Sequence, residues 1–241
     1  MPTRWDFSGK TVLVTGVGRA GQIGHAVAHA LGRAGARLVA VDRNAVGVAE
    51  RVREFLAEGI EARPAAGDLT EFDVAALAVE TALKHFGRLD AVVNVAGGLT
   101  TYGPVSTTDP AGFDREIAIN LKTAFLMSRA AVDALAETRG AIVNFASIAY
   151  FRPMGQMAVY SAAKAGVAAL SQSLAVELWP RRVRVNAIAP GMVRTPENLA
   201  SAGPGAHFVE LEQLCDAVLF LAGDASSGIT GQVIPVTNGI V

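Results

Sequence analysis

Three residues with proton-transfer chemistry lie close together in the chain: Ser147, Tyr160 and Lys164. Tyr160 and Lys164 are one helical turn apart in the run VYSAAKAGVAALSQSLAVEL, so a helix there places both side chains on one face. A free phenol has a pKa of roughly 10, and a neighbouring cation favours its ionised form. We therefore expect Lys164 to lower the pKa of Tyr160 and make it a general base near neutral pH. The alternative is a surface Tyr and Lys that share only their helical spacing.

Two stretches are expected to position these side chains and a ligand beside them. The run GAIVNFASI, residues 140–148, predicts a strand that delivers Ser147 at its carboxyl end, where open α/β sheets bind ligands. Near the start of the chain, TVLVTG predicts a buried strand, and VGRAGQIG leads from it into an Ala-rich helix. Strand, glycine-rich turn and helix in this order indicate a dinucleotide site, with the pyrophosphate at the helix N-terminus. An ordinary glycine-rich turn is the competing interpretation.

The strand within RLVAVDRN ends at the residue expected to choose between dinucleotides. Asp42 can accept hydrogen bonds from the adenosine ribose hydroxyls and would repel a 2′-phosphate. Arg19 and Arg43 act in the opposite sense, because either guanidinium can pair with that phosphate. We expect NAD as the cofactor, with NADP as the alternative.

Further apolar runs at residues 60–69, 89–98, 182–190 and 231–239 alternate with helical patterns. This alternation predicts an α/β fold of the Rossmann type, a doubly wound parallel sheet of about seven strands with helices on both faces. No linker-like, repetitive or low-complexity stretch divides the sequence. Residues 1–241 are therefore expected to form one domain for dinucleotide binding and catalysis, with a substrate loop at about 191–210.

Composition argues against several other classes of protein. The chain has 241 residues, 51% of them hydrophobic and 18% charged, and its net charge of −1 leaves no electrostatic footprint for nucleic acid or an anionic membrane. The single cysteine, Cys215, has apolar neighbours at helical period and predicts a core thiol. One cysteine, no apolar signal core and no apolar run of roughly 20 residues favour the cytoplasm. No cluster of His, Cys and Asp has metal-ligand spacing, so no metal is expected.

Ser147, Tyr160 and Lys164, in this order and spacing, resemble the catalytic set of the short-chain dehydrogenases/reductases, and the resemblance extends from Lys10 to about Val236. It implies an NAD(P)-dependent oxidoreductase that transfers a hydride between nicotinamide and a secondary alcohol or ketone. Tyr160 would be the acid–base group, Ser147 would orient the substrate oxygen, and Lys164 would bind the nicotinamide ribose. Asn120, inside the long helical pattern after residue 108, matches the family residue that bends this helix and positions a relay water.

The resemblance also assigns the cofactor contacts. Besides Tyr160 and Lys164, the positions that match the family's cofactor-binding residues are Gly16, Gly21, Gln22, Ile23, Asp42, Asp68, Leu69, Asn94, Ala96, Gly97, Pro190, Gly191, Val193 and Thr195. For Asn94 a second role is open, because its amide can tie neighbouring strands together.

The chain departs from the family pattern in four places. Gln22 stands where the second glycine of TGxxxGxG is usual, and the glycine-rich loop is longer by two residues, so that Gly18 and Gly21 would supply its flexibility. Val95 replaces the second Asn of NNAG, and Asn238 replaces a glycine. The loop at 191–210 is shorter than the usual substrate lid, which indicates an open site or one that a neighbouring subunit completes.

Two other functions compete with this interpretation. An NADPH-dependent reductase of 3-oxoacyl thioesters on acyl carrier protein would use the same chemistry on another substrate. A non-catalytic dinucleotide-binding regulator should have lost Ser147, Tyr160 or Lys164, and all three are present. We expect a small alcohol or ketone as the substrate. A homotetramer is expected because the family is commonly tetrameric and because two helices, in residues 123–135 and 167–178, are apolar on more than one face.

Overall fold

A parallel sheet of seven strands forms the centre of the computed structural model, which describes residues 5–239. The strand order is β3-β2-β1-β4-β5-β6-β7, and every neighbouring pair runs parallel. The outermost positions of the expected domain, 1–4 and 240–241, lie outside the described residues. The strands are β1 (Thr11–Thr15), β2 (Arg37–Asp42), β3 (Ala62–Ala66), β4 (Ala91–Asn94), β5 (Ala141–Phe145), β6 (Arg184–Pro190) and β7 (Val233–Val236).

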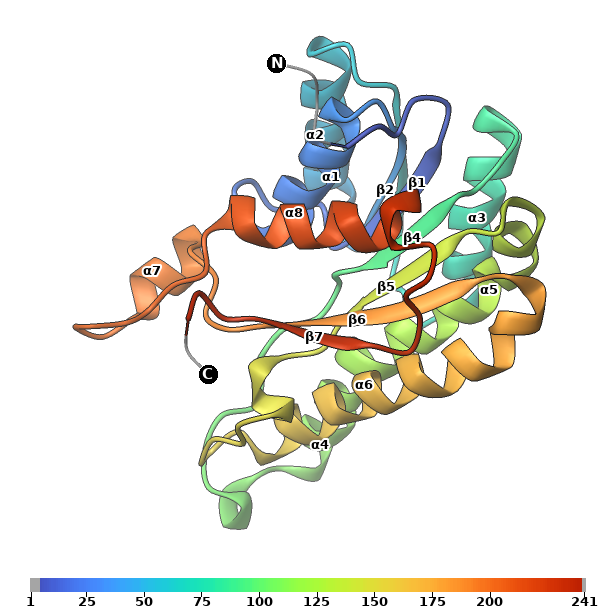
Figure 1. Cartoon of the computed structure of the whole chain (residues 1–241). Coiled ribbons are helices and arrows are strands. Elements are labelled where there is room, and N and C mark those ends of the chain that lie inside the picture. Colours follow the sequence, from blue (N-terminus) through green and yellow to red (C-terminus); the bar gives the residue numbers. More distant parts are fainter. Residues whose placement is uncertain (1–4, 240–241) are drawn as a thin grey trace.

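Helices cover both faces of the sheet, which confirms the expected Rossmann-type fold (Figure 1). One face packs against α1, α2 and α8, and the other against α3, α5 and α6. The helices of the described residues are α1 (Ile23–Arg33), α2 (Ala45–Ala57), α3 (Phe72–Phe86), α4 (Pro110–Ile117), α5 (Thr123–Thr138), α6 (Ala158–Leu178), α7 (Pro196–Ser201) and α8 (Leu211–Ala222), with a π-helical turn, η2 (Ala118–Lys122), between α4 and α5.

The apolar runs of the sequence become strands because both of their faces are buried. In β1, Val12 and Val14 enter the core beneath α1 and α8, whereas Leu13 enters the core beneath α3 and α5. All three side chains are fully buried, which explains why the strand shows no alternation of apolar and polar residues. The two cores hold the sheet rigidly and fix the positions of the loops that leave its carboxyl edge.

The strand order reverses between β1 and β4, since the chain builds outward from β1 to β3 and then crosses back. In open parallel sheets this switch point leaves a crevice at the carboxyl ends of the strands, where ligands bind. The loops after β1, β4 and β5 all leave the sheet at this edge, and they carry the expected site residues Gly16, Gly21, Gln22, Ala96, Gly97 and Ser147.

Two segments are irregular. The π-helical turn η2 interrupts the long helical pattern after residue 108 at Asn120, where the family resemblance implies a bend, and the Asn120 side chain donates to the carbonyl of Glu116 one turn earlier. The substrate loop contains a short helix, α7, whose first turn is capped by the Thr195 hydroxyl. None of the helices in residues 5–239 combines the length and the apolar character needed to cross a bilayer.

Candidate active site

Ser147, Tyr160 and Lys164 come together at the carboxyl edge of β5. Ser147 follows the strand directly and is nearly buried, and its hydroxyl accepts a hydrogen bond from the Ala149 amide. Tyr160 and Lys164 lie in the first two turns of α6, with the Lys164 Nζ atom 5.8 Å from the centroid of the Tyr160 ring. The Lys164 ammonium donates to the Phe145 carbonyl at 2.7 Å, which ties α6 to the end of β5.

The pKa of Tyr160 moves in the direction opposite to the one expected from sequence. Burial raises the pKa of the phenol above its ordinary value, and a hydrogen bond with the Ser147 side chain offsets part of the rise. Burial also lowers the pKa of Lys164 to about 8. The expectation that Lys164 lowers the pKa of Tyr160 is therefore wrong, since desolvation dominates both groups. At neutral pH the phenol is protonated and is a proton donor.

Asn120 links the same site to the exit of β4. Its carboxamide oxygen accepts from the Gly98 amide at 3.0 Å, and its nitrogen donates to the Gly98 carbonyl at 2.9 Å. A Cβ atom on Gly97 would lie 2.5 Å from this carboxamide oxygen, so the close approach requires glycine at that position. Asn120 thus holds the loop after β4 against the helical turn that precedes α5.

Glu116 belongs to this cluster and was not indicated by the sequence. Its side chain is fully buried at the end of α4 and accepts hydrogen bonds from Asn120 and from Thr100. A carboxylate four residues before Asn120 in an otherwise amphipathic run is the signal that could have identified it, because residues four apart share a helical face.

The glycine-rich loop has the geometry of a phosphate cradle. Gly16 adopts φ +76°, and a Cβ atom there would lie 3.1 Å from the Ala96 amide nitrogen, so the loops after β1 and β4 touch at this point. Gly21 adopts φ +69°, in the left-handed region, whereas Gln22 has φ −88°. Gln22 can therefore replace a glycine without strain, and Gly21 supplies the turn just before α1 begins at Ile23.

Asp42 is anchored where an adenosine ribose is expected. One carboxylate oxygen accepts from the Gly18 amide and the other from the Asn44 amide, each at 2.8 Å. Gly18 is needed here for steric reasons, since a Cβ atom would lie 2.7 Å from the Asp42 carboxyl carbon. Arg19 forms an exposed ion pair of 2.8 Å with Glu197 of α7, so the lengthened loop contacts the substrate loop.

Of the other residues expected to contact the cofactor, Asp68 is exposed, whereas Leu69 and Asn94 are buried. Asp68 is exposed, and hydrogen bonds from Thr70 hold its pKa below the ordinary value, whereas the Leu69 side chain lies in the core. The buried Asn94 side chain donates to Asn144 at 2.8 Å, which favours the role as a tie between β4 and β5.

On the far side of the crevice, the segment after β6 offers backbone groups and the Thr195 hydroxyl as possible contacts for a ligand. Pro190 ends β6, and the Gly191 amide donates to Val236 of β7. Val193 pairs with Val209 across the substrate loop, and the buried Thr195 hydroxyl accepts from the Asn198 amide at 3.2 Å. The Thr195 hydroxyl is thus used as a helix cap, and only its own proton is free to donate to a ligand.

These features together fit a nicotinamide dinucleotide. Gly16 and Gly21 leave backbone exposed at the N-terminus of α1 for a pyrophosphate, and Asp42 offers a carboxylate to the adenosine ribose. Cys215 does not contribute a nucleophile, since it is buried in α8 and burial raises the pKa of its thiol to about 12. The chemistry of the site is therefore that of proton transfer beside a bound dinucleotide.

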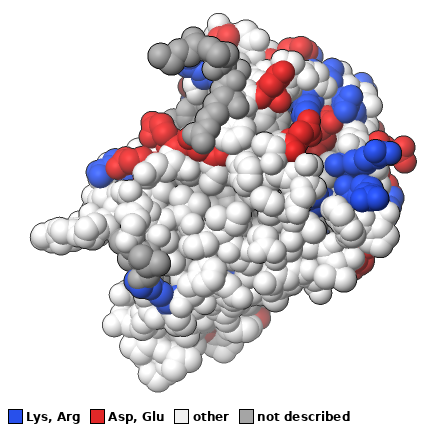
Figure 2. Space-filling view, in the orientation of Figure 1, with Lys and Arg blue, Asp and Glu red and all other residues white. Residues whose placement is uncertain are grey.

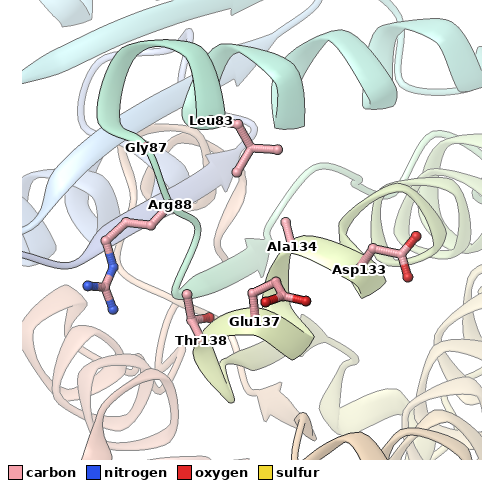
Figure 3. A pocket seen from close by; sticks show the side chains of 7 residues that line it. All are labelled: Leu83, Gly87, Arg88, Asp133, Ala134, Glu137 and Thr138. Atoms are coloured by element: carbon pink, nitrogen blue, oxygen red, sulfur yellow. The ribbon is translucent and has the colours of Figure 1, made fainter.

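One surface hollow lies away from this site and another lies beside it. The larger, about 510 Å³, is lined by residues of α3, α5 and the loop before β4, among them Arg88 and Glu137 (Figure 3). It lies at the amino edge of the sheet, far from Ser147 in the fold, and its Arg88 is already paired with Asp90. A smaller hollow, about 200 Å³, is lined by residues 100–104 and the start of α4, beside Glu116.

Comparisons with known proteins agree with this geometry. A family model described as enoyl-(acyl carrier protein) reductase matches residues 16–241. The 3-oxoacyl-[acyl-carrier-protein] reductase of Thermotoga maritima is 33% identical over 248 residues, which cover 98% of this chain and 99% of the relative. A short-chain type dehydrogenase/reductase from Mycobacterium ulcerans superimposes with a TM-score of 0.91 at 33% identity, over 97% of this chain and 90% of that one.

A 7α-hydroxysteroid dehydrogenase solved with NADH and 7-oxo glycochenodeoxycholic acid is also similar. It is 27% identical, has a TM-score of 0.90, and is matched over 97% of this chain and 95% of its own. The chain therefore belongs to the short-chain dehydrogenase/reductase family. Like its relatives, it is an NAD(P)-dependent oxidoreductase that transfers a hydride between nicotinamide and a secondary alcohol or ketone.

Proposed function

We propose that the protein is an NAD-preferring dehydrogenase of small secondary alcohols, with Ser147, Tyr160, Lys164 and Asn120 as its working residues. The observation that carries this proposal is the convergence of the first three at the carboxyl edge of β5, beside the switch point of the sheet. A shared hydrogen bond between Ser147 and Tyr160 places hydroxyl and phenol where one substrate oxygen could contact both.

Each residue has a distinct part in the reaction. Tyr160 gives a proton to the carbonyl oxygen in reduction and takes it from the hydroxyl in oxidation. Ser147 orients and polarises the same oxygen, and Lys164 binds the nicotinamide ribose hydroxyls. The bound dinucleotide supplies or accepts the hydride. Asn120 positions the relay water and, through its bonds to Gly98, keeps the loop after β4 in place.

The substrate wall is apolar and partly open. Phe151, Met154 and Met157 lie on the segment between Ser147 and Tyr160, and the first two are about half exposed. The Gly103 amide donates to the Gln156 carbonyl at 2.9 Å, so the loop after β4 lies beside this segment. A substrate with an apolar body next to its alcohol or ketone carbon would match such a wall.

NAD is favoured by the position of Asp42, and Glu197 adds to this preference. The Asp42 carboxylate would face a 2′-phosphate at close range, which is an unfavourable contact between like charges. Arg19 could offset it, but Glu197 already holds this guanidinium. The similar hydroxysteroid dehydrogenase was solved with NADH, which is consistent with the preference.

Three further properties belong to the proposal. Residues 1–241 form one domain, in which residues 191–210 are the substrate loop.

The chain assembles as a homotetramer, supported by exposed apolar side chains such as Phe125 on α5 and Val176 on α6. The face over β7 in Figure 2 also displays few charged side chains, and β7 is an edge strand. The cytoplasm is the proposed location, since a lone buried cysteine fits a reducing compartment.

A reductase of 3-oxoacyl thioesters on acyl carrier protein is the second candidate, favoured by the relative from Thermotoga maritima. The two are separated by steady-state assays with NAD and NADP against a panel of secondary alcohols, ketones and 3-oxoacyl thioesters. Turnover of an apolar secondary alcohol with NAD at the highest kcat/KM would support the proposal. A preference for NADPH and a thioester would replace it by the second candidate.

A further inference from the structure

Glu116 is a buried acid that the proposed reaction does not use. Its side chain has no solvent exposure, although it lies in the last turn of α4, four residues before Asn120. Acidic side chains are almost never fully buried unless they are paired or hydrogen-bonded. Its partners are therefore informative about what it does.

Both carboxylate oxygens of Glu116 accept hydrogen bonds. The amide and the hydroxyl of Thr100 donate to one oxygen, the amide at 2.9 Å, and the Asn120 side-chain nitrogen donates to the other at 3.2 Å. The Thr100 amide and the Asn120 NH₂ group can only donate, and the Thr100 hydroxyl donates as well, so the carboxylate oxygens are acceptors toward every one of these partners. No cation of the described residues lies in direct contact to cancel its charge.

The charges around Glu116 come from α4 and from the elements packed against it, η2 and α6. Asp114 and Arg115 on α4 are exposed, as is Tyr102 on the neighbouring loop. The titratable residues of η2 and α6 are Lys122, Tyr160, Lys164 and Glu177. Of these, Tyr160 and Lys164 are under the influence of the Glu116 charge, which raises the pKa of each.

We propose that Glu116 is a positioning residue of the active site: its carboxylate fixes the Asn120 carboxamide against Gly98, and its buried negative charge acts on Lys164 across the contact of α4 with α6. Asn120 would otherwise be held on its nitrogen side by the carbonyls of Gly98 and Glu116 alone. Within residues 5–239, Lys164 has a single hydrogen-bond partner, Phe145, so a buried anion in its surroundings stabilises its charged form. The role in catalysis rests on the proposed function, but the electrostatic coupling does not.

The direction of the coupling follows from the sign of the charge. Removing the anion with Glu116→Gln lowers the pKa of both Tyr160 and Lys164, because each loses a negative neighbour that favoured its protonated form. A residue with a purely structural role would change stability but would leave both titrations in place.

The first test is a spectroscopic titration of the protein alone. The chain contains three tyrosines, so the near-ultraviolet phenolate signal of Tyr160 is obtained by subtracting the titration of Tyr160→Phe. The protein is brought to each pH by rapid mixing, and its absorbance is recorded before it unfolds. We expect the Tyr160 transition to occur at lower pH in Glu116→Gln than in the wild type. Asp114→Asn, an exposed acid on the same helix, is the matched control and should not move it.

The second test uses the pH profile of kcat for alcohol oxidation. Glu116→Gln should move the rising limb of this profile, which follows ionisation of Tyr160, to lower pH. Asp114→Asn should leave it in place, and Glu116→Asp, which keeps the charge, should restore most of the wild-type profile. If Glu116→Gln does not fold, Glu116→Met removes the same charge at a similar length and takes its place.

An unchanged Tyr160 transition in the charge-removing variant overturns the proposal, whatever the activity. A wild type that turns over no alcohol or ketone with either dinucleotide refutes the proposed function instead, and the spectroscopic titration still decides the coupling. A transition that shifts equally in Asp114→Asn would also overturn the assignment, since it would reflect general charge and not the buried carboxylate.

Discussion

Lys164 faces the Tyr160 ring at 5.8 Å while its ammonium is bonded to the Phe145 carbonyl. The lysine is therefore not a direct hydrogen-bond partner that ionises the phenol but a buried cation held by the end of β5. Its place beside Tyr160 comes from the helical spacing of α6, and its orientation comes from a strand that ends 19 residues earlier in the chain.

Tyr160→Phe should abolish most of the activity and leave the fold intact. The variant removes only the phenolic hydroxyl, so NAD affinity and circular dichroism should stay close to those of the wild type. Turnover should fall by roughly 10²-fold or more, as expected when a general acid–base is lost. Steady-state kinetics check this, and a turnover within about threefold of wild type would refute the role.

The two reaction directions should have different pH optima. Because the pKa of Tyr160 is raised, the phenol is protonated at neutral pH and can donate to a ketone, whereas oxidation requires the phenolate. Reduction should therefore be fastest at neutral pH and decline in alkali, while oxidation should increase with pH. Initial rates measured in both directions across the same pH range check this. An oxidation optimum at lower pH than the reduction optimum would contradict the prediction.

Lys164→Met should change the pH dependence of stability. The pKa of Lys164 is about 8 in the folded protein against an ordinary 10.5, so the unfolded chain binds the extra proton between these values. Stability of the wild type should therefore rise with pH through this window, because a burial penalty on the order of 3 kcal/mol is complete below pH 8 and is lost as the pH rises toward 10.5.

The Lys164→Met variant lacks this contribution. Urea unfolding at several pH values should show that its stability relative to wild type is highest below pH 8 and declines toward pH 10.5. A constant difference between the two proteins across the range would mean that Lys164 is not desolvated.

Cofactor choice should depend on Asp42 together with Glu197. We expect kcat/KM for NAD to exceed that for NADP by roughly tenfold, equivalent to about 1.4 kcal/mol. Asp42→Ala should narrow or reverse this ratio, and adding Glu197→Gln should move it further toward NADP, because Arg19 is then free to pair with the 2′-phosphate. Measured ratios that do not change in either variant would assign the choice to another part of the loop.

The oligomeric state tests the exposed apolar side chains. Light scattering at micromolar concentration should report a tetramer of the 24.9 kDa chain. Val176→Lys on α6, where the side chain is 79% exposed, should weaken the assembly, whereas Val46→Lys on α2, 69% exposed, should not. A monomer as the sole species in the wild type would disprove the proposed assembly.

The strands and the proximity of Ser147, Tyr160 and Lys164 could be predicted from sequence because their signals are local. The apolar run of β1 and the spacing of Tyr160 and Lys164 each depend on a few neighbouring residues and on one face of an element. The sequence also indicated which residues make the lengthened loop flexible. Gly21 adopts the left-handed backbone conformation that favours glycine, whereas Gln22 has an ordinary negative φ.

What could not be predicted depends on contacts between distant segments. The burial of Glu116 depends on its contact with Thr100 of another loop, and the orientation of the Asn120 carboxamide depends on its bonds to Gly98. The direction of the Tyr160 pKa depends on how completely the folded chain surrounds the phenol, which spacing alone does not reveal.

The lengthened glycine-rich loop touches α7 at two points, the Arg19–Glu197 ion pair and the contact of Gly21 with Pro196. The segment that we propose binds the dinucleotide and the segment that we propose selects the substrate are therefore in direct contact. Mutant libraries aimed at α7 to widen the range of accepted alcohols will also alter dinucleotide affinity, so the two selectivities of this enzyme have to be evolved together.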